Sequence, residues 1–464
     1  MEEIEAISPI DGRYKRQTES LADIFSEKGL IKYRVKVGGE YFIFLSEHPK
    51  INVRTFSKKE KGLIRKLYDL SIEDTKIVKA IEVKGYKYIK PTNHDVKAVE
   101  YFIKEKLKGT SLEDSLEWIH FALTSDDTDN IAYGLMLSDG IGNVISPAVE
   151  SLHKKIEEFA QTYKDVPMLA RTHGQPASPT SVGKEFKVFS SRLRRQLDQL
   201  KNYEILVKLN GATGNYNAHY VAYPEINWIK FTKDFIEKFN KDRKIKLKPN
   251  FITTQIENHD TYVELFDNLR RINNIVIDFD QDMWRYISDS WITQKHVEWE
   301  VGSSTMPHKV NPIDFENSEG NLGLSNSLLS FFSTKLPISR LQRDLSDSTV
   351  KRNFGVALSY SLIGYKSSLK GLDKVAINKE KFTRELESHP EVIAEAIQTV
   401  LRREGVKTPY EQLKKLTRGK RGTIEDFRKF IESLDVSKRV KEELKQITPT
   451  NYTGIAKFLV EFDT

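Results

Sequence analysis

The sequence predicts an all-α protein built around a central bundle of long helices. Apolar residues recur every three or four positions over 145–159, 182–200 and 265–291, which is the spacing of one helix face. Runs that alternate apolar and polar residues, as strands do, are short and weak throughout. A chain of 464 residues exceeds what one hydrophobic core organises, so two or three domains are expected.

The segment 182–200 shows the helical pattern most clearly. No proline interrupts the chain between Pro179 and Pro224, and the apolar stripe consists of Val182, Phe186, Phe189, Leu193, Leu197 and Leu200. Stripes of this length exceed what a compact monomer usually covers. We therefore expect the central bundle to be shared between subunits.

Changes in composition divide the chain into three predicted domains, residues 1–112, 113–365 and 366–464. Turn and capping residues occur at the first boundary in "GTSLEDS", and shorter lysine-rich helices are expected after the second. The stretch "NKDRKIKLKPN", residues 240–250, is predicted to be an exposed loop or insertion.

The amino-acid composition of the chain limits the classes of function that it can have. The chain has no cysteine, which excludes disulfides and thiolate metal sites and favours the cytoplasm. The acidic start "MEEIEAISPIDGRY" and the absence of any apolar run of about 18 residues disfavour export and membrane insertion. A net charge of +7 without a concentrated basic arm argues against nucleic acid and fits a small anionic substrate.

The stretch "GSSTMPHKVNP", residues 302–312, combines groups that can remove and stabilise a proton. Gly302 leaves the backbone before Ser303 and Ser304 unobstructed, as in mobile lids. A serine acts as a base only when cations such as Lys309, or backbone amides, stabilise its alkoxide. For "GSS" alone, a polar turn that caps the helix after Pro312 is the favoured explanation.

The whole of this stretch resembles the signature loop of the fumarase/aspartase superfamily. Within that superfamily, "SPIDGRY", "RTHGQ" and "RDLSDSTVKRN" resemble the adenylosuccinate lyase family, particularly its bacterial form with an extended amino terminus. The resemblance covers nearly the whole chain. It implies a three-domain helical fold whose central helices join four subunits, with each active site assembled from three of them.

The resemblance also implies an activity that needs no cofactor. Members of the family split adenylosuccinate into AMP and fumarate, and split a succinyl-aminoimidazole-carboxamide ribotide in the same way. Ser303 then corresponds to the base and His173 to the general acid, a role that suits a histidine near neutral pH. Metal is not expected, because no histidine pair has the spacing of a metal-binding helix.

Further positions match the family's contacts to a nucleotide substrate. They are polar or charged, with one valine in the loop and one in "STVKR": Arg13, Tyr14, Asn93, His94, Asp95, Thr124, Ser125, Gln255, Ser304, Lys309, Val310, Asn311, Asn317, Arg343, Ser348, Thr349, Val350, Lys351 and Arg352. His94 could instead, or in addition, cap the helix that starts near Val96. "TSDDTDN" departs from the family pattern, which more often has glutamate third and two asparagines at the end.

Two other functions remain open from the sequence. A sister lyase could act on argininosuccinate, fumarate or aspartate, and a non-catalytic binding protein could use the same fold. The presence of Ser303, Lys309 and His173 argues against lost catalysis. "DGRY" and "DSTVKR" carry guanidinium and hydroxyl groups, which favour a phosphorylated nucleotide over argininosuccinate.

Overall fold

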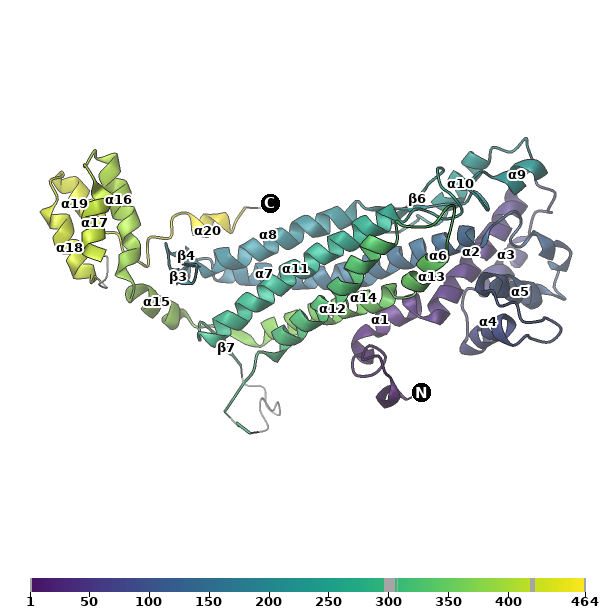
Figure 1. Cartoon of the computed structure of the whole chain (residues 1–464), viewed down its shortest axis with the longest axis horizontal. Coiled ribbons are helices and arrows are strands. Elements are labelled where there is room, and N and C mark those ends of the chain that lie inside the picture. Colours follow the sequence, from purple (N-terminus) through teal and green to yellow (C-terminus); the bar gives the residue numbers. More distant parts are fainter. Residues whose placement is uncertain (1, 296–304, 307, 418–421, 463–464) are drawn as a thin grey trace. The chain divides into compact units, whose positions relative to one another are not determined.

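A computed structural model describes residues 2–295, 305–306, 308–417 and 422–462. In these ranges the regular structure is overwhelmingly helical (Figure 1), and each strand has only two to four residues. The strands pair two at a time and form no larger sheet within the described residues. These findings confirm the predicted all-α fold.

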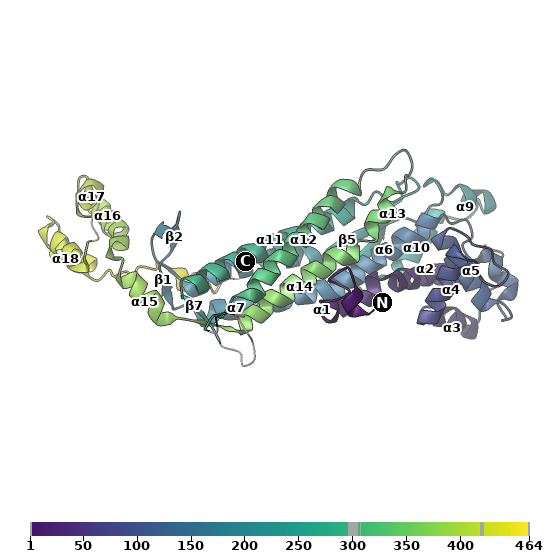
Figure 2. The same ribbon diagram turned by 60° about the horizontal axis from the view of Figure 1, so that its bottom comes forward.

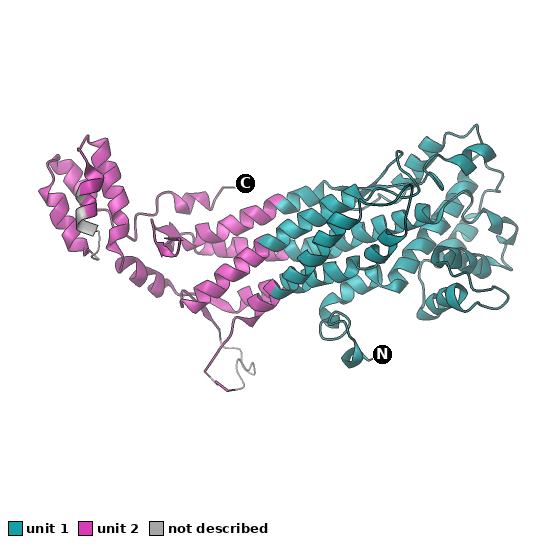
Figure 3. Ribbon diagram, viewed as in Figure 1, with its two compact units in different colours: residues 1–149, 196–274, 320–365 teal, residues 150–195, 275–319, 366–464 magenta. Residues whose placement is uncertain are grey.

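The chain forms two compact units, each made of three separate segments (Figure 3). Unit 1 comprises residues 1–149, 196–274 and 320–365, and unit 2 comprises residues 150–195, 275–319 and 366–464. The division of the chain at 112 and 366 stays a prediction.

Unit 1 contains, within the described residues, nine α-helices of its own, most of them from the first half of the chain. Its helices are α1 (Lys15–Phe25), α2 (Glu27–Glu47), α3 (Lys58–Lys66), α4 (Ile72–Val83), α5 (Asp95–Leu107), α6 (Ser125–Gly140), α9 (Asn217–Ala222), α10 (Trp228–Glu237) and α13 (Ser346–Lys351). Helix α2 packs against both α5 and α6, and α4 lies along α5 (Figure 2). Helix α2 therefore holds the starts of two helices that carry predicted site residues.

Five long helices contribute residues to both units. They are α7 (Ser146–Thr162), α8 (Val182–Lys201), α11 (Asp260–Ser288), α12 (Ile313–Lys335) and α14 (Phe354–Asp373). Aromatic rings pack them together: in unit 2 the Phe186 ring contacts Phe159 and Phe279, and in unit 1 the Phe354 ring contacts Phe266 and Phe332. The three long helices predicted from apolar periodicity are confirmed as α7, α8 and α11.

The rest of unit 2 consists of short helices and three pairs of short strands. The helices are α15 (Lys379–Glu387), α16 (Ala394–Arg403), α17 (Pro409–Thr417), α18 (Ile424–Ser433), α19 (Lys438–Lys445) and α20 (Ala456–Leu459). The strands are β1 (Pro167–Met168), β2 (Arg171–Thr172), β3 (Gln175–Pro176), β4 (Thr180–Ser181), β7 (Ile292–Gln294) and β8 (Val375–Ile377). Leu401, Phe427 and Leu444 are buried together and hold the C-terminal helices. Among the helices described, none is both long and apolar enough to cross a membrane.

The prediction that residues 240–250 form an exposed loop is wrong in part: residues 240–245 are a loop, as predicted, but the residues that follow form a strand. Strand β6 (Lys246–Pro249) pairs in parallel with β5 (Glu204–Val207), and both belong to unit 1. Ile245 and Leu247 are buried, while the lysines between and beside them point outward. Apolar side chains inside alternate with lysines outside, which is the pattern of a half-buried strand. The high lysine content obscures this alternation in the sequence.

The Asn240 side chain holds this strand in place. It is buried, its Nδ2 donates to the Leu247 carbonyl at 2.8 Å, and its Oδ1 accepts from the Leu247 backbone N–H at 2.8 Å. We expect Asn240→Ala to lower the free energy of unfolding by about 2 kcal/mol, because it leaves buried backbone groups unpaired. Urea denaturation of the intact protein measures this change. Lys248→Ala, on the exposed face of the same strand, is the control and should change stability by about 0.5 kcal/mol or less; equal stability of the two variants would contradict the assignment.

Candidate active site

His94 and Ser125 meet at the starts of two helices in unit 1. His94 is the N-cap of α5, and its Nδ1 accepts from the Lys97 backbone N–H at 3.3 Å. Since Nδ1 acts as an acceptor, the ring proton lies on Nε2, which faces Ser125 Oγ at 3.2 Å. The capping role expected for His94 is confirmed, and it is compatible with a substrate contact because about half of the side chain is exposed.

Three carboxylates in the first turns of α6 point into the protein interior. Asp127 forms an ion pair of 2.9 Å with Lys208, and both side chains are fully buried. Asp127 also accepts from the backbone N–H of Thr124 at 2.8 Å and from that of Asn210 at 3.0 Å. These contacts fix the predicted substrate residue Thr124 at the start of α6.

The other two carboxylates each face a different buried cation. Asp129 Oδ1 accepts from Arg34 Nε at 2.5 Å, and Asp126 lies 3.7 Å from Lys351 Nζ. Burial raises the pKa of Asp126, whereas Lys351 opposes that rise. The departures of "TSDDTDN" from the family pattern therefore lie inside the protein, behind Thr124 and Ser125.

Asp95 joins two arginines at the start of α5. Arg34 Nη2 and Arg352 Nη2 each donate to Asp95 Oδ2 at 2.8 Å. Partial burial alone would raise the pKa of the Asp95 carboxyl, but Arg34, the Val96 backbone N–H and Arg352 hold it at about 2. Asp95 is therefore a carboxylate throughout the physiological range, and it positions the exposed guanidinium of Arg352.

Helix α13 carries the "STVKR" residues with two different exposures. Ser348 is half-buried and Thr349 is exposed, so both hydroxyl groups are accessible to a ligand. Val350 and Lys351 are buried. Lys351 Nζ lies 2.7 Å from Asp347, and although burial alone would lower the pKa of Lys351, Asp126 and Asp347 raise it. Lys351 thus anchors the helix from behind, whereas Ser348 and Thr349 face outward.

Arg343 and Gln255 form a second polar pair in unit 1. Arg343 Nη1 donates to Gln255 Oε1 at 3.1 Å, and the Gln255 carbonyl accepts from Lys208 Nζ at 2.8 Å. Arg343 Nε is buried and has no hydrogen-bond partner within the part of the chain that the structure describes. A buried guanidinium N–H without an acceptor is suited to an incoming anion.

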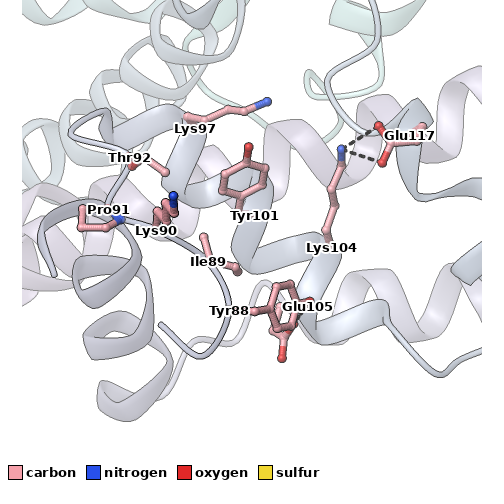
Figure 4. Close-up of a pocket in the computed structure, with 10 residues that line it drawn as sticks. All are labelled: Tyr88, Ile89, Lys90, Pro91, Thr92, Lys97, Tyr101, Lys104, Glu105 and Glu117. Carbon is pink, nitrogen blue, oxygen red and sulfur yellow. Dashed lines mark hydrogen bonds and ion pairs between the residues drawn. The ribbon is translucent and has the colours of Figure 1, made fainter. Parts of the chain in front are cut away.

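Unit 1 has two further features that bear on the site. Arg13 is exposed and Tyr14 is the N-cap of α1. A cavity of about 570 Å³ opens beside Thr92, whose hydroxyl accepts from the His94 backbone N–H, and Lys97, whose backbone N–H donates to the His94 ring (Figure 4). Tyr101 stands in its wall, and the lining described includes none of the predicted substrate contacts. Asn93, between Thr92 and His94, adopts a positive φ of 47°, which turns the chain into the helix cap.

His173 lies in unit 2, at the tip of the hairpin formed by β2 and β3. His173 and Gly174 form its two-residue loop, with φ of 53° and 73°, the conformation of a tight hairpin turn. Arg171 holds the base of this hairpin by an ion pair with Glu385 and lies over the Trp291 ring. The His173 side chain is exposed, so the turn presents an imidazole to whatever lies beyond the tip.

The signature loop is only partly described. Ser303 and Ser304 lie outside the described residues. Lys309 and Val310 are exposed, and the Val310 carbonyl accepts from Gln294 Nε2 at 3.0 Å. The neighbouring Asn311 is half-buried, just before α12.

Asn317 belongs to α12 in unit 2. Its Nδ2 donates to Ser367 Oγ at 3.0 Å, and that hydroxyl donates to the Asp314 carbonyl at 2.9 Å. The predicted contacts in unit 2 are therefore His173, the loop residues from Lys309 to Asn311, and Asn317.

The structure adds three residues that the sequence analysis missed. Arg34 and Lys208 pair with carboxylates beside Thr124 and Ser125, and His259 is fully buried near Lys351. Burial lowers the pKa of His259 to about 3, so its ring is neutral. Lys32 and Lys36 flank Arg34 on α2, so nothing in the sequence distinguishes this arginine from its neighbours, and Lys208 and His259 carry no distinguishing signal either.

Unit 1 thus gathers four separate regions of the sequence: the helix starts at His94 and Thr124, the segment at Gln255, and the segment from Arg343 through helix α13. They present hydroxyl groups, an imidazole and two guanidinium groups, which together suit a polyanionic ligand. No group of three or more histidine, aspartate or glutamate side chains in the described ranges is arranged to hold a metal ion.

The sequence matches two family models. A model described as "Lyase" matches residues 12–324, and one described as "Adenylosuccinate lyase C-terminal" matches residues 339–453. Curated relatives named adenylosuccinate lyase include those of Escherichia coli strain K12, 48% identical over 98% of both chains, and Haemophilus influenzae, with the same identity and coverage. The relative from Dictyostelium discoideum is 49% identical over 97% of this chain and 96% of its own.

Solved structures confirm the fold. A fumarate lyase from Mesorhizobium sp. BNC1 aligns with a TM-score of 0.72 at 15% identity, over 96% of both chains. The 3-carboxy-cis,cis-muconate lactonizing enzyme from Pseudomonas putida aligns with a TM-score of 0.70 at 17% identity, over 96% of this chain and 95% of its own. With relatives of nearly half-identical sequence along almost its entire length, this chain belongs to the adenylosuccinate lyase family.

Proposed function

We propose that this protein removes fumarate from adenylosuccinate to leave AMP, and removes it in the same way from succinyl-aminoimidazole-carboxamide ribotide (SAICAR) to leave AICAR. The gathering of His94, Ser125, Arg343 and helix α13 in unit 1 is the observation that carries the proposal. A substrate with a phosphate and a succinyl group needs hydroxyl and guanidinium groups at several points, and these residues supply them. The names of the close relatives support the same activity.

Binding is divided between the two ends of the substrate in this proposal. Arg352, Ser348 and Thr349 bind the nucleotide phosphate, together with Arg13 and Tyr14. The accessible hydroxyl groups of Ser348 and Thr349 and the exposed Arg352 guanidinium support this assignment.

The succinyl carboxylates bind on the other side of the proposed site. Thr124 and Ser125 hold them at the start of α6, with Gln255 and Arg343 beside them. The buried Arg343 N–H, which lacks an acceptor within the described part of the chain, supports a carboxylate at this position.

The proposed chemistry is a β-elimination by one base and one acid. Ser303 removes the proton from the carbon next to a carboxylate, and charge accumulates on that carboxylate as an aci-carboxylate dianion. Lys309 and Asn311 stabilise this charge. His173 then protonates the departing nitrogen, a step that an exposed imidazole at a hairpin tip can perform near neutral pH. No cofactor takes part.

The proposal includes a homotetramer with shared active sites. Helix α12 has large apolar side chains both inside and outside: Leu322 and Leu329 are buried, whereas Leu324 and Phe331 are 53% and 51% exposed. Large apolar side chains exposed on a long helix mark a contact surface, so a second chain is the natural partner for that side. We place the assembly in the cytoplasm, which a chain without cysteine suits.

The purified protein should release fumarate from adenylosuccinate without any added metal or nucleotide cofactor, because acid, base and cations all come from side chains. The loss of absorbance on conversion to AMP measures this, with argininosuccinate assayed in parallel as the alternative substrate. Activity that a chelator abolishes and a divalent ion restores, or turnover of argininosuccinate alone, would contradict the proposal.

Removing either proposed proton-transfer group should slow turnover without preventing substrate binding. We expect Ser303→Ala and His173→Ala each to lower kcat by at least about 10². Steady-state kinetics and equilibrium binding of adenylosuccinate measure the two effects separately. His48→Ala, which removes the histidine at the C-terminal end of α2, serves as the control, and a wild-type rate in either test variant would remove that residue from the mechanism.

Shared sites can be tested with two inactive proteins. Ser303→Ala and His173→Ala proteins, unfolded and refolded together, should form some sites in which each intact residue comes from a different subunit. Fumarate release should then reappear in the mixture, whereas each variant refolded alone stays inactive. A mixed tetramer that contains both variants and remains inactive would exclude sites shared in this way.

A further inference from the structure

A chain of alternating charges runs behind the substrate-binding elements of unit 1. It begins at Asp129 on α6, passes through Arg34 on α2 to Asp95 on α5, and continues through Arg352 to Glu27. The last contact, from Arg352 Nη1 to Glu27, is 3.0 Å. Three helices and the end of α13 are thus connected by charge-assisted hydrogen bonds.

Arg34 is the buried centre of this chain. Only 1% of its surface is exposed, and Asp129 is 8% exposed. Its Nε binds Asp129 while its Nη2 binds Asp95, so two different N–H groups of one planar guanidinium hold carboxylates on two helices. A lysine ammonium is a point charge and cannot reproduce this fixed fork.

The two carboxylates that Arg34 holds are next to the proposed substrate contacts. Asp95 directly follows His94, and Asp129 lies one helical turn beyond Ser125 on α6. The contact of 3.2 Å between His94 Nε2 and Ser125 Oγ therefore depends on the spacing of α5 and α6. Arg34, on the helix that packs against both, bridges a carboxylate of α5 and a carboxylate of α6.

We propose that Arg34 is a positioning residue for the elimination: it holds Asp95 and Asp129 so that His94, Ser125 and Arg352 are ordered before the substrate arrives. The inference rests on the proposed function, because the residues it orders are the proposed substrate contacts. Arg34 itself does not touch the substrate. Residues that lock the groups around a site reduce the entropy lost on binding and keep the reacting geometry within tight limits.

Asp129 is a charged acceptor for Arg34, whereas an asparagine at this position would offer a neutral one. An aspartate adds a second full negative charge beside the buried guanidinium, and breaking such a buried pair leaves an uncompensated charge. An asparagine keeps an acceptor of the same shape, and Asp95 still compensates the charge of Arg34. Asp129→Asn should therefore fold and retain the hydrogen bond, and it tests the charge of Asp129 separately from its shape.

Loss of Arg34 has a distinct pH signature. The charged or titratable groups that face Asp95 are Arg34, Arg352 and His94, whose Nδ1 is 3.8 Å from Asp95 Oδ1; Glu27 and Asp129 act on it through the two arginines. Arg34 is the strongest of the influences that lower the pKa of Asp95 to about 2, and burial opposes it. Without Arg34 the pKa of Asp95 rises, so protonation of Asp95 as pH falls releases Arg352 and weakens nucleotide binding.

The test compares Arg34→Met and Arg34→Lys with the wild type. We expect Arg34→Met to raise KM for adenylosuccinate and Kd for AMP by at least about 10-fold at pH 7, and to move the acidic limb of kcat/KM upward by at least about one pH unit. Arg34→Lys, which restores the charge without the fork, should give an intermediate shift. Asp129→Asn should leave the limb in place, because Arg34 still binds Asp95.

The matched control is Arg243→Met. Arg243 forms a largely buried ion pair with Asp139 at the opposite end of α6, so its loss has a comparable structural cost away from the proposed site. Circular dichroism and sedimentation report whether each variant folds and assembles. If Arg34→Met does not fold, Arg34→Lys alone decides the outcome.

Two results overturn the inference. One is a folded Arg34→Met or Arg34→Lys protein with wild-type KM, AMP affinity and acidic limb; the other is a loss of kcat that is equal at every pH and is also produced by Arg243→Met. A wild type that neither binds AMP nor releases fumarate refutes the proposed function instead. The two failures are therefore distinguishable.

Discussion

Three carboxylates enter the protein interior at the start of α6, and the surrounding structure depends on neutralising them. Removing a charge from water costs several kcal/mol unless an opposite charge compensates it. Asp126, Asp127 and Asp129 accordingly face Lys351, Lys208 and Arg34. These cations come from α13, from the end of β5 and from α2, so segments separated by up to some three hundred positions in the chain have to converge on one helix end.

This convergence explains why the candidate site forms where it does. The cations occupy the interior side of α6, which leaves Thr124 and Ser125 at its solvent-facing start. The buried Lys351 anchors α13 to the interior, so Ser348 and Thr349 face outward. The polar groups that the substrate would contact are thus the outer surface of a buried ionic cluster. Binding groups of this kind are ordered by contacts that the substrate never makes.

The sequence revealed the long helices and the segments of the site, because each has a local signal. Apolar periodicity marks α7, α8 and α11, and the polar residues of "NHD" stand at the start of a helix. The sequence did not reveal strand β6, where lysines hide the alternation of Ile245 and Leu247, or the partners of Asp129. Arg34 lies between Lys32 and Lys36 on α2, and its pairing with Asp129 across 95 positions leaves no local trace in the sequence.

The two histidines proposed to serve the reaction are held by different kinds of structure, which bears on how a complete site can arise. His94 is fixed as a helix cap within the ionic framework of unit 1, and its ring is already paired with Ser125. His173 sits in a two-residue turn whose conformation is set locally, by positive φ angles and by the anchored Arg171. A turn of this kind orients its imidazole outward without specifying what it meets. The assembly of the chains therefore decides which surface faces His173. Motif matching identifies residues within one chain and cannot reveal that surface.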